Sequence, residues 1–186
     1  ANFLNACLRR FLREREAMVV ASDADPVALW NHPLWWIERL RRERPHDWQG
    51  ILAAANAHAP MTLRVNPRKT SVADYLLLLE RAGVAARWGG ASAVYLEQAV
   101  AVRHIPGFDA GLVSVQDAAA QLAAPLLLGG LPATTGLRVL DACAAPGGKT
   151  GHLLEISECA LTALEIDPRR SERIGANLQR LQLSAQ

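Results

Sequence analysis

The chain has 186 residues, of which 51% are apolar and 20% charged, so it can bury a sizeable core in one or two domains. No apolar run reaches the length of a membrane span, and no basic-then-apolar signal peptide opens the sequence. The three cysteines (Cys7, Cys143 and Cys159) are far apart and odd in number, which favours a reduced, cytoplasmic compartment. Neither they nor the five scattered histidines show metal-ligand spacing, so we expect no metal site.

The first 58 residues carry helical periodicity. A helix is expected over 1–18 and another over 27–44, which Pro33 interrupts and Pro45 ends. A short helix is expected over 48–58. This region also holds four tryptophans, which more commonly form a core than stack on unpaired bases: Trp30, Trp35, Trp36 and Trp48.

The basic side chains concentrate near the N-terminus. Residues 1–70 carry a formal charge of +4 and residues 71–186 a charge of −2. Nearby glutamates make helical ion pairs plausible, so a solvated helix face is the alternative to RNA contact. The candidate RNA-binding residues are Arg9, Arg10, Arg13, Arg39, Arg41 and Arg42.

A small α+β unit is expected over 59–106. Its strands are expected at 62–65, 84–88 and 99–102, and Ser71 caps a helix that Gly83 ends. Three basic residues, one in the first strand and two in the turn after it, are candidates for phosphate contact or are simply exposed charges: Arg64, Arg68 and Lys69.

The most informative segment is LRVLDACAAPGGKT, residues 137–150. It follows a short strand at 113–115, an apolar helix at 117–128 and a linker at 129–136. It is typical of a buried strand that ends at Asp141, a turn of small residues, and a helix opening at Lys149. Free N–H groups and the helix dipole at such a turn favour an anionic or zwitterionic cofactor.

A second buried strand, ALTALEID (160–167), ends in the acids Glu165 and Asp167, ahead of a helix expected over 168–183. Glu165 lies 24 residues after Asp141, close to the roughly 20-residue offset at which an acid binds a ribose diol in dinucleotide folds. Glu165 is therefore the first candidate for ribose binding and Asp167 the second. The βαβα order predicts the start of a doubly wound, Rossmann-like α/β sheet.

Three cofactors compete for this turn. A dinucleotide site requires G-x-G-x-x-G, which is missing, and a phosphate-binding P-loop requires a glycine where Cys143 stands. S-adenosylmethionine fits, with its methionine end at the turn and its ribose at Glu165. A plain strand–helix corner without ligand is the remaining alternative.

The segment ACAAPGGKT resembles the cofactor loop of the RNA 5-methylcytosine methyltransferases. The resemblance covers essentially the whole chain and narrows to the branch that acts on bacterial small-subunit ribosomal RNA. It implies that residues 1–58 are the last part of a NusB-like helical RNA-binding domain and that 107–186 begin the methyltransferase domain. The further matching segments are Asn2–Phe11, Asn31–Trp36, Met61–Asn66, Gly107–Phe108 and Ser114–Gln121.

The resemblance implies methylation of carbon 5 of a cytosine in 16S ribosomal RNA by covalent cysteine catalysis. The family's two catalytic cysteine motifs do not occur before Gln186, so we expect an inactive fragment that binds cofactor. We also expect the protein to be a monomer. Cys143 would be a buried, inert member of the turn. An RNA-binding module without catalysis is the competing function.

The expected roles of the residues present are narrower. Lys149 would pair with the carboxylate of the cofactor, Asp141 would orient the turn, and Gln116 and Asp117 would support it. The cofactor-binding candidates are Cys143, Ala144, Ala145, Pro146, Gly147, Gly148, Lys149, Glu165 and Asp167.

Overall fold

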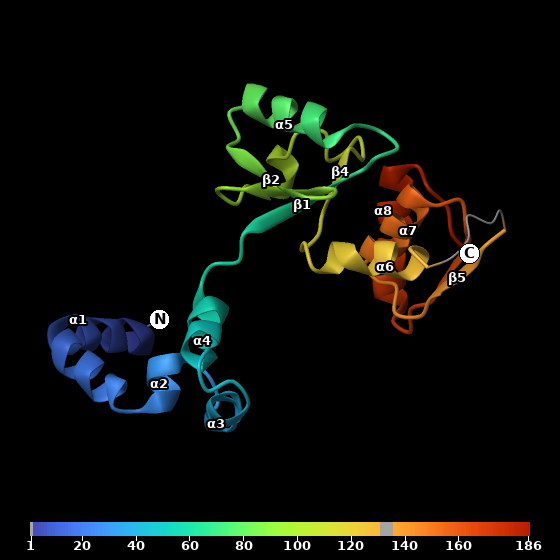
Figure 1. Cartoon of the computed structure of the whole chain (residues 1–186). Coiled ribbons are helices and arrows are strands. Elements are labelled where there is room, and N and C mark those ends of the chain that lie inside the picture. The colour runs from blue at the N-terminus through green and yellow to red at the C-terminus, as the bar shows by residue number, and fades with distance from the viewer. Residues whose placement is uncertain (1, 131–135) are drawn as a thin grey trace. The chain divides into compact units, whose positions relative to one another are not determined.

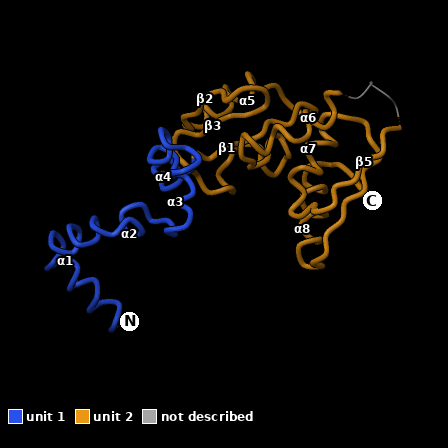
Figure 2. Tube along the Cα trace, turned by 60° about the horizontal axis from the view of Figure 1, so that its bottom comes forward, with its two compact units in different colours: residues 1–59 blue, residues 60–186 orange. Residues whose placement is uncertain are grey.

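The computed structural model describes residues 2–130 and 136–186. They form two compact units, residues 1–59 and residues 60–186, which are coloured separately in Figure 2. Most of the linker expected over 129–136 lies outside the described residues.

The first unit is helical. Its core consists of Ile37, Leu40 and Leu52, with Trp30, Trp36 and Trp48 packed against them, whereas Trp35 is exposed. The tryptophans are therefore mainly core residues, as expected. The long first helix has no buried residue. The helices are α1 (Asn2–Asp23), α2 (Pro26–Trp30), α3 (Leu34–Glu43) and α4 (Trp48–Asn56).

The second unit begins with a four-stranded antiparallel sheet in the order β2-β3-β1-β4 (Figure 1). Apolar residues of the sheet and of α5 form one core, which includes Leu63, Tyr75, Leu79 and Val94. Ser71 caps α5, because its hydroxyl accepts the Asp74 N–H at 3.1 Å. The elements are β1 (Met61–Val65), α5 (Val72–Arg81), β2 (Ala86–Gly90), β3 (Ala93–Leu96), a 3₁₀ turn η1 (Val102–His104) and β4 (Val113–Val115).

Two expectations for this sheet need correction. The strand expected at 99–102 is wrong, because the chain turns tightly at Gly90 (φ +96°) and Ala91 (φ +41°) and pairs immediately as β3. β4, which the sequence grouped with the methyltransferase segment, instead pairs antiparallel with β1, with Arg64 opposite Ser114.

The remainder of this unit contains a parallel pair of strands covered by helices. β5 and β6 pair in parallel, with Asp141 opposite Ala163, and α6, α7 and α8 supply the side chains packed against Val139 and Leu161. The elements are a 3₁₀ turn η2 (Ala120–Leu122), α6 (Ala123–Leu128), β5 (Arg138–Asp141), α7 (Gly148–Ile156), β6 (Ala160–Ala163) and α8 (Pro168–Leu181).

Two details of this part differ from expectation. The helix expected over 117–128 is shorter, because Asp117 caps a turn at the Ala119 N–H and a 3₁₀ turn precedes α6. β5 is not fully buried. Leu140 is 60% exposed because successive side chains of a strand face opposite ways, and it is Val139 that packs against the core.

Candidate functional site

The turn between β5 and α7 is built by glycine and by two short hydrogen bonds. Gly147 adopts φ +97° at the N-cap of α7, a conformation that favours glycine, and its N–H donates to Ala144 O at 2.6 Å. The Thr150 hydroxyl donates to the Asp141 carboxylate at 2.7 Å. Asp141 therefore ties the end of the strand to the first turn of the helix, as its position in the sequence predicted.

The beginning of α7 offers backbone donors. The first N–H groups of a helix have no acceptor within the helix, and the helix dipole makes this end electropositive. A Cβ added at Gly148 would meet only Gln116 Nε2, at 3.7 Å, so the backbone there is open to a close approach. The exposed Lys149 adds a positive charge beside these donors.

The parallel strands bring the second acidic segment to the same edge. The Leu164 N–H donates to Asp141 O at 2.8 Å, and the Ala144 N–H donates to Leu164 O at 2.9 Å. The Arg170 guanidinium then spans the two segments, donating to Ala145 O and to Glu165 Oε1, each at 3.4 Å. The turn and Glu165 are therefore neighbours in space.

The two acids have different environments. The Glu165 side chain is only 3% exposed, and its Oε1 accepts the Asp167 N–H at 3.2 Å as well as Arg170. Asp167 is the N-cap of α8, where its carboxylate accepts the Arg169 N–H at 2.9 Å. Asp167 is therefore used as a helix cap, whereas Glu165 caps no helix.

Two small cavities border the turn. One of about 160 Å³ is lined by Asp141, Ala142 and Lys149 together with Leu140 and residues of α6 and α7. Another of about 270 Å³ has Pro146 and Gly148 on one side and Arg173, Asn177 and Arg180 on the other.

Arg64 in β1, and Arg68 and Lys69 in the loop after it, have roles that the sequence did not reveal. Arg64 is 0% exposed, and its Nε and Nη2 donate to the Glu155 carboxylate at 2.9 and 2.7 Å. Its Nη1 donates to Gly148 O at 2.8 Å and to the Gln116 side chain. Neither sequence-based interpretation of Arg64 holds, since it is neither exposed nor free for a phosphate. Gln116 does support the turn, through Arg64.

Arg68 and Lys69 are also occupied. Arg68 donates to Glu155 O at 3.1 Å and to the Glu158 carboxylate at 2.7 Å, at the end of α7. Lys69 Nζ donates to Ala110 O at 2.7 Å and to the Gln182 side chain at 3.0 Å. Both side chains join the loop after β1 to other parts of the same unit, although Arg68 remains exposed to solvent, as one of the two interpretations expected.

Arg180 makes the reciprocal attachment from α8. It donates to Phe108 O, Val113 O and Ser114 Oγ at 2.6, 2.9 and 3.0 Å, and it lies over the Phe108 ring. Burial lowers the pKa of its guanidinium below the usual value.

His152 lies in the same buried region. It is 3% exposed, and within the described part of the chain its Nδ1 has no hydrogen-bond partner. Burial, and then the charge of Arg64, lowers the pKa of His152 from 6.5 to about 4. The ring borders a cavity of about 440 Å³ that the β2–β3 turn and residues near α6 complete.

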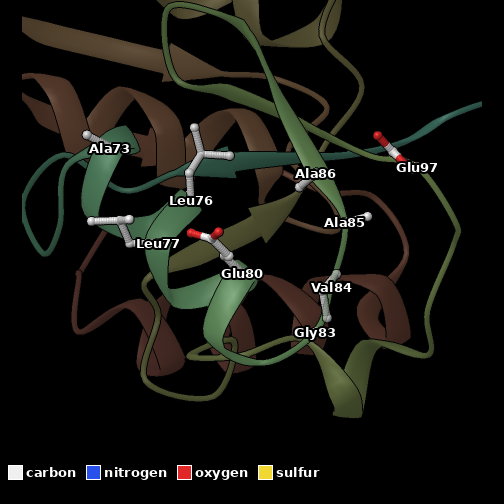
Figure 3. A pocket seen from close by; sticks show the side chains of 9 residues that line it. All are labelled: Ala73, Leu76, Leu77, Glu80, Gly83, Val84, Ala85, Ala86 and Glu97. Atoms are coloured by element: carbon white, nitrogen blue, oxygen red, sulfur yellow. The ribbon is translucent and has the colours of Figure 1, made fainter.

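A further cavity of about 730 Å³ lies between α5 and β2 (Figure 3). Its walls are mainly apolar, with Leu76, Leu77 and Val84 among them, and its ionisable residues are Glu80 and Glu97. None of its lining residues belongs to the turn or to the Glu165 segment, and two carboxylates alone do not suggest a cofactor.

The three cysteines are free thiols. Cys7 and Cys143 are exposed, and Cys159 is partly buried and packs against the core beside β5 and β6. The expectation that Cys143 is buried is wrong, because the turn carries its side chain outward.

Some of the candidate RNA-binding arginines of α1 and α3, here called the arginine clusters, contact other side chains of the chain. Arg10 pairs with Glu14 and Arg39 with Glu43, each at 3.0 Å and four residues apart, and Arg41 lies over the Trp48 ring at 4.4 Å. Exposed pairs of this kind contribute little to stability, so they leave these side chains able to exchange partners.

Within residues 2–130 and 136–186, no group of three His, Cys, Asp or Glu residues could hold a metal ion. No helix in the same residues is long and apolar enough to cross a membrane.

Comparison with known proteins identifies two matching family models. The RsmF/B-like methyltransferase ferredoxin-like domain matches residues 32–103, and the 16S rRNA methyltransferase RsmB/F family matches residues 131–186. The ribosomal RNA small subunit methyltransferase B of Pseudomonas putida is 46% identical over 98% of the chain, and that of Vibrio cholerae is 42% identical over 98%. The chain spans 42% of the length of each.

Solved structures share the fold. A methyltransferase homologue from Pyrococcus horikoshii has a TM-score of 0.68 at 24% identity, covering 86% of this chain and 52% of its own. NSun6 from the same organism, solved with SFG, has a TM-score of 0.69 at 12% identity, covering 83% and 64%.

Proposed function

The chain belongs to the RsmB/F methyltransferase family, and from that premise we propose that it contributes the cofactor site of an enzyme that methylates carbon 5 of a cytosine in 16S ribosomal RNA. We propose this activity for a protein as long as the curated relatives, of which the chain spans 42%, and we expect it to act in the cytoplasm. The observation that carries the proposal is the juxtaposition of the glycine turn before α7 with the buried Glu165 carboxylate.

We propose S-adenosylmethionine as the cofactor, which when bound supplies an electrophilic methyl group. Residues 143–149 would hold its methionine end with the N–H groups of the first turn of α7, and Lys149 would pair with its carboxylate. Glu165 would accept both ribose hydroxyls, replacing the long contact to the half-exposed Arg170. NSun6, which shares this fold, was solved with SFG, an analogue of S-adenosylmethionine, and this supports the choice of cofactor. A doubly wound sheet continuing from β5 and β6 is part of the same proposal.

Glu165 provides the test of the site. A buried carboxylate that accepts two hydroxyls makes charge-assisted hydrogen bonds. Glu165→Ala should therefore weaken the binding free energy of S-adenosylhomocysteine by about 1.5–3 kcal/mol, which is roughly a ten- to hundredfold loss of affinity. Calorimetric titration of the 186-residue chain with S-adenosylhomocysteine measures the change. The exposed Glu158→Ala is the matched control and should bind like the parent chain.

Two outcomes would contradict this assignment. Unchanged affinity in a folded Glu165→Ala variant would exclude Glu165, and Asp167→Ala would be tested next. Magnesium-dependent binding of ATP without binding of S-adenosylhomocysteine would instead favour the P-loop alternative.

We further propose that the chain binds 16S ribosomal RNA but does not transfer a methyl group by itself. None of Cys7, Cys143 and Cys159 stands in either of the family's two catalytic cysteine motifs, which do not occur in these 186 residues. Incubation with tritiated methyl donor and unmodified small-subunit RNA should give no labelled 5-methylcytosine. Label in the product would show that one of these cysteines is catalytic.

The RNA contact should be electrostatic. We assign it to Arg9, Arg10 and Arg13 of α1 and to Arg39, Arg41 and Arg42 of α3. Replacing Arg9, Arg13 and Arg42 by glutamine should lower the slope of log affinity against log salt by roughly 2–3, since each lost phosphate contact removes about 0.7–0.9. Arg81, Arg87 and Arg103→Gln in the second unit is the charge-matched control. Equal slopes for all variants would show that the clusters are solvated helix faces.

A further inference from the structure

We propose that Arg64 is a positioning residue for the cofactor turn: from the neighbouring antiparallel sheet it fixes the direction of the first backbone donors of α7. This inference rests on the proposed cofactor site. Arg64 would not touch the cofactor itself, and it would act through the Gly148 carbonyl.

The contacts place one guanidinium at two levels of α7. Nη1 donates to Gly148 O in the first turn, while Nε and Nη2 donate to Glu155, seven residues further along the helix. Seven residues span about 10 Å at 1.5 Å per residue. The Glu155 side chain, which a helix directs toward its N-terminus, and the guanidinium together cover this distance. Arg64 therefore fixes both the position of α7 along its axis and its rotation relative to β1.

The bond to Gly148 has a direct consequence for ligand binding. The Gly148 carbonyl and the Lys149 N–H belong to the same planar peptide unit, so fixing the carbonyl also fixes the N–H, which points the opposite way. The positive charge on the carbonyl side also polarises the unit and strengthens the N–H as a donor. The Lys149 N–H is one of the donors assigned to the methionine end of the cofactor.

Gln116 completes the arrangement. Its side-chain oxygen accepts from the same Nη1, and its backbone N–H donates to Thr62 O at 3.1 Å, which joins it to β1. The guanidinium thus lies between fixed acceptors with no exposed surface. The buried guanidinium is therefore held in one orientation, whereas an exposed ion pair on the surface would be free to change its geometry.

The test separates positioning from stability by removing both charges. Replacing a buried ion pair by apolar residues of similar volume is often neutral for stability, whereas removing one partner is strongly destabilising. The test variant is therefore Arg64→Met with Glu155→Met. The control is Arg68→Met with Glu158→Met, which removes the partly exposed pair at the other end of α7.

Two measurements are made on the 186-residue chain: the affinity for S-adenosylhomocysteine and the hydrogen exchange of the Gly147 amide, which donates to Ala144 O within the turn. If the competent orientation of the turn falls to about a tenth of its population, the apparent Kd rises about tenfold. We expect that rise, with faster Gly147 exchange, in the test variant and neither change in the control.

Unchanged affinity and unchanged Gly147 exchange in the folded test variant would overturn the proposal. If the parent chain does not bind S-adenosylhomocysteine, the proposed function fails, while the exchange of Gly147 still decides whether Arg64 orders the turn. Should the double variant not fold, Gln116→Glu replaces it, because a carboxylate there competes with Gly148 O for Nη1. Faster Gly147 exchange then supports the proposal, and exchange equal to that of the parent chain refutes it.

Discussion

His152 should make the stability of the second unit strongly dependent on pH. Its pKa is about 4 in the folded chain, because the ring is buried and Arg64 repels a second positive charge, and 6.5 is the ordinary value in an unfolded chain. Between these two values the unfolded chain binds more protons than the folded one. The free energy of unfolding therefore falls as the pH drops from about 6.5 toward 4.

The magnitude follows from the two pKa values. The full shift corresponds to about 3 kcal/mol once the pH is below both of them, and about 2 kcal/mol of this should already be lost between pH 7.5 and pH 5. Total stabilities of domains are roughly 5–15 kcal/mol, so a loss of this size is readily measured.

The assay is urea unfolding at pH 7.5 and pH 5, with the parent chain and His152→Leu compared. The variant should retain about 2 kcal/mol more of its stability at pH 5 than the parent chain does, each relative to pH 7.5. The exposed His104→Leu is the control for general histidine titration and should behave like the parent chain. An imidazole of His152 that titrates near pH 6.5, or equal pH dependence in all three proteins, would refute the reasoning.

Three further substitutions test the local structure. Ser71→Ala should lower the free energy of unfolding by about 1 kcal/mol through loss of the cap of α5, and Ser171→Ala, inside α8 at an exposed position, should not. Leu79→Ala should lower it by about 2–5 kcal/mol in urea unfolding, because this side chain is fully buried in the sheet core. Gly147→Ala should weaken binding of S-adenosylhomocysteine in calorimetry, since φ +97° strains a residue with a Cβ, and equal affinity would show that the turn tolerates the change.

Local chemistry was the part of the fold that the sequence predicted well. The cap at Ser71, the strand–turn–helix around Asp141 and the link from Asp141 to the turn all depend on neighbouring residues, and the structure confirms them. The prediction misplaced β3, because it put the strand in the apolar run 99–102, although Gly89-Gly90 is a turn signal that places the next strand directly after it.

The role of Arg64 could not be predicted from its own segment. A signal was nevertheless present in two places, since Arg64 stands in an otherwise uncharged strand and Glu155 in the run His152–Ile156 of a helix. Charged residues are seldom fully buried without a partner. Two opposite charges, each within a mainly apolar segment, indicate a buried pair, although only the tertiary structure shows that they meet.

The same pair explains why the antiparallel sheet and the cofactor segment form one compact unit. Arg64 and Arg68 reach from the first strand and its loop to α7, and Arg180 reaches back from α8 to the loop and strand at Phe108–Ser114. Each guanidinium donates to backbone carbonyls as well as to side chains, so the two parts are joined at fixed positions. The turn that presents N–H groups to a ligand gains its orientation from the bond between Arg64 and Gly148 O, while Arg68 holds the far end of α7 and Arg180 holds α8.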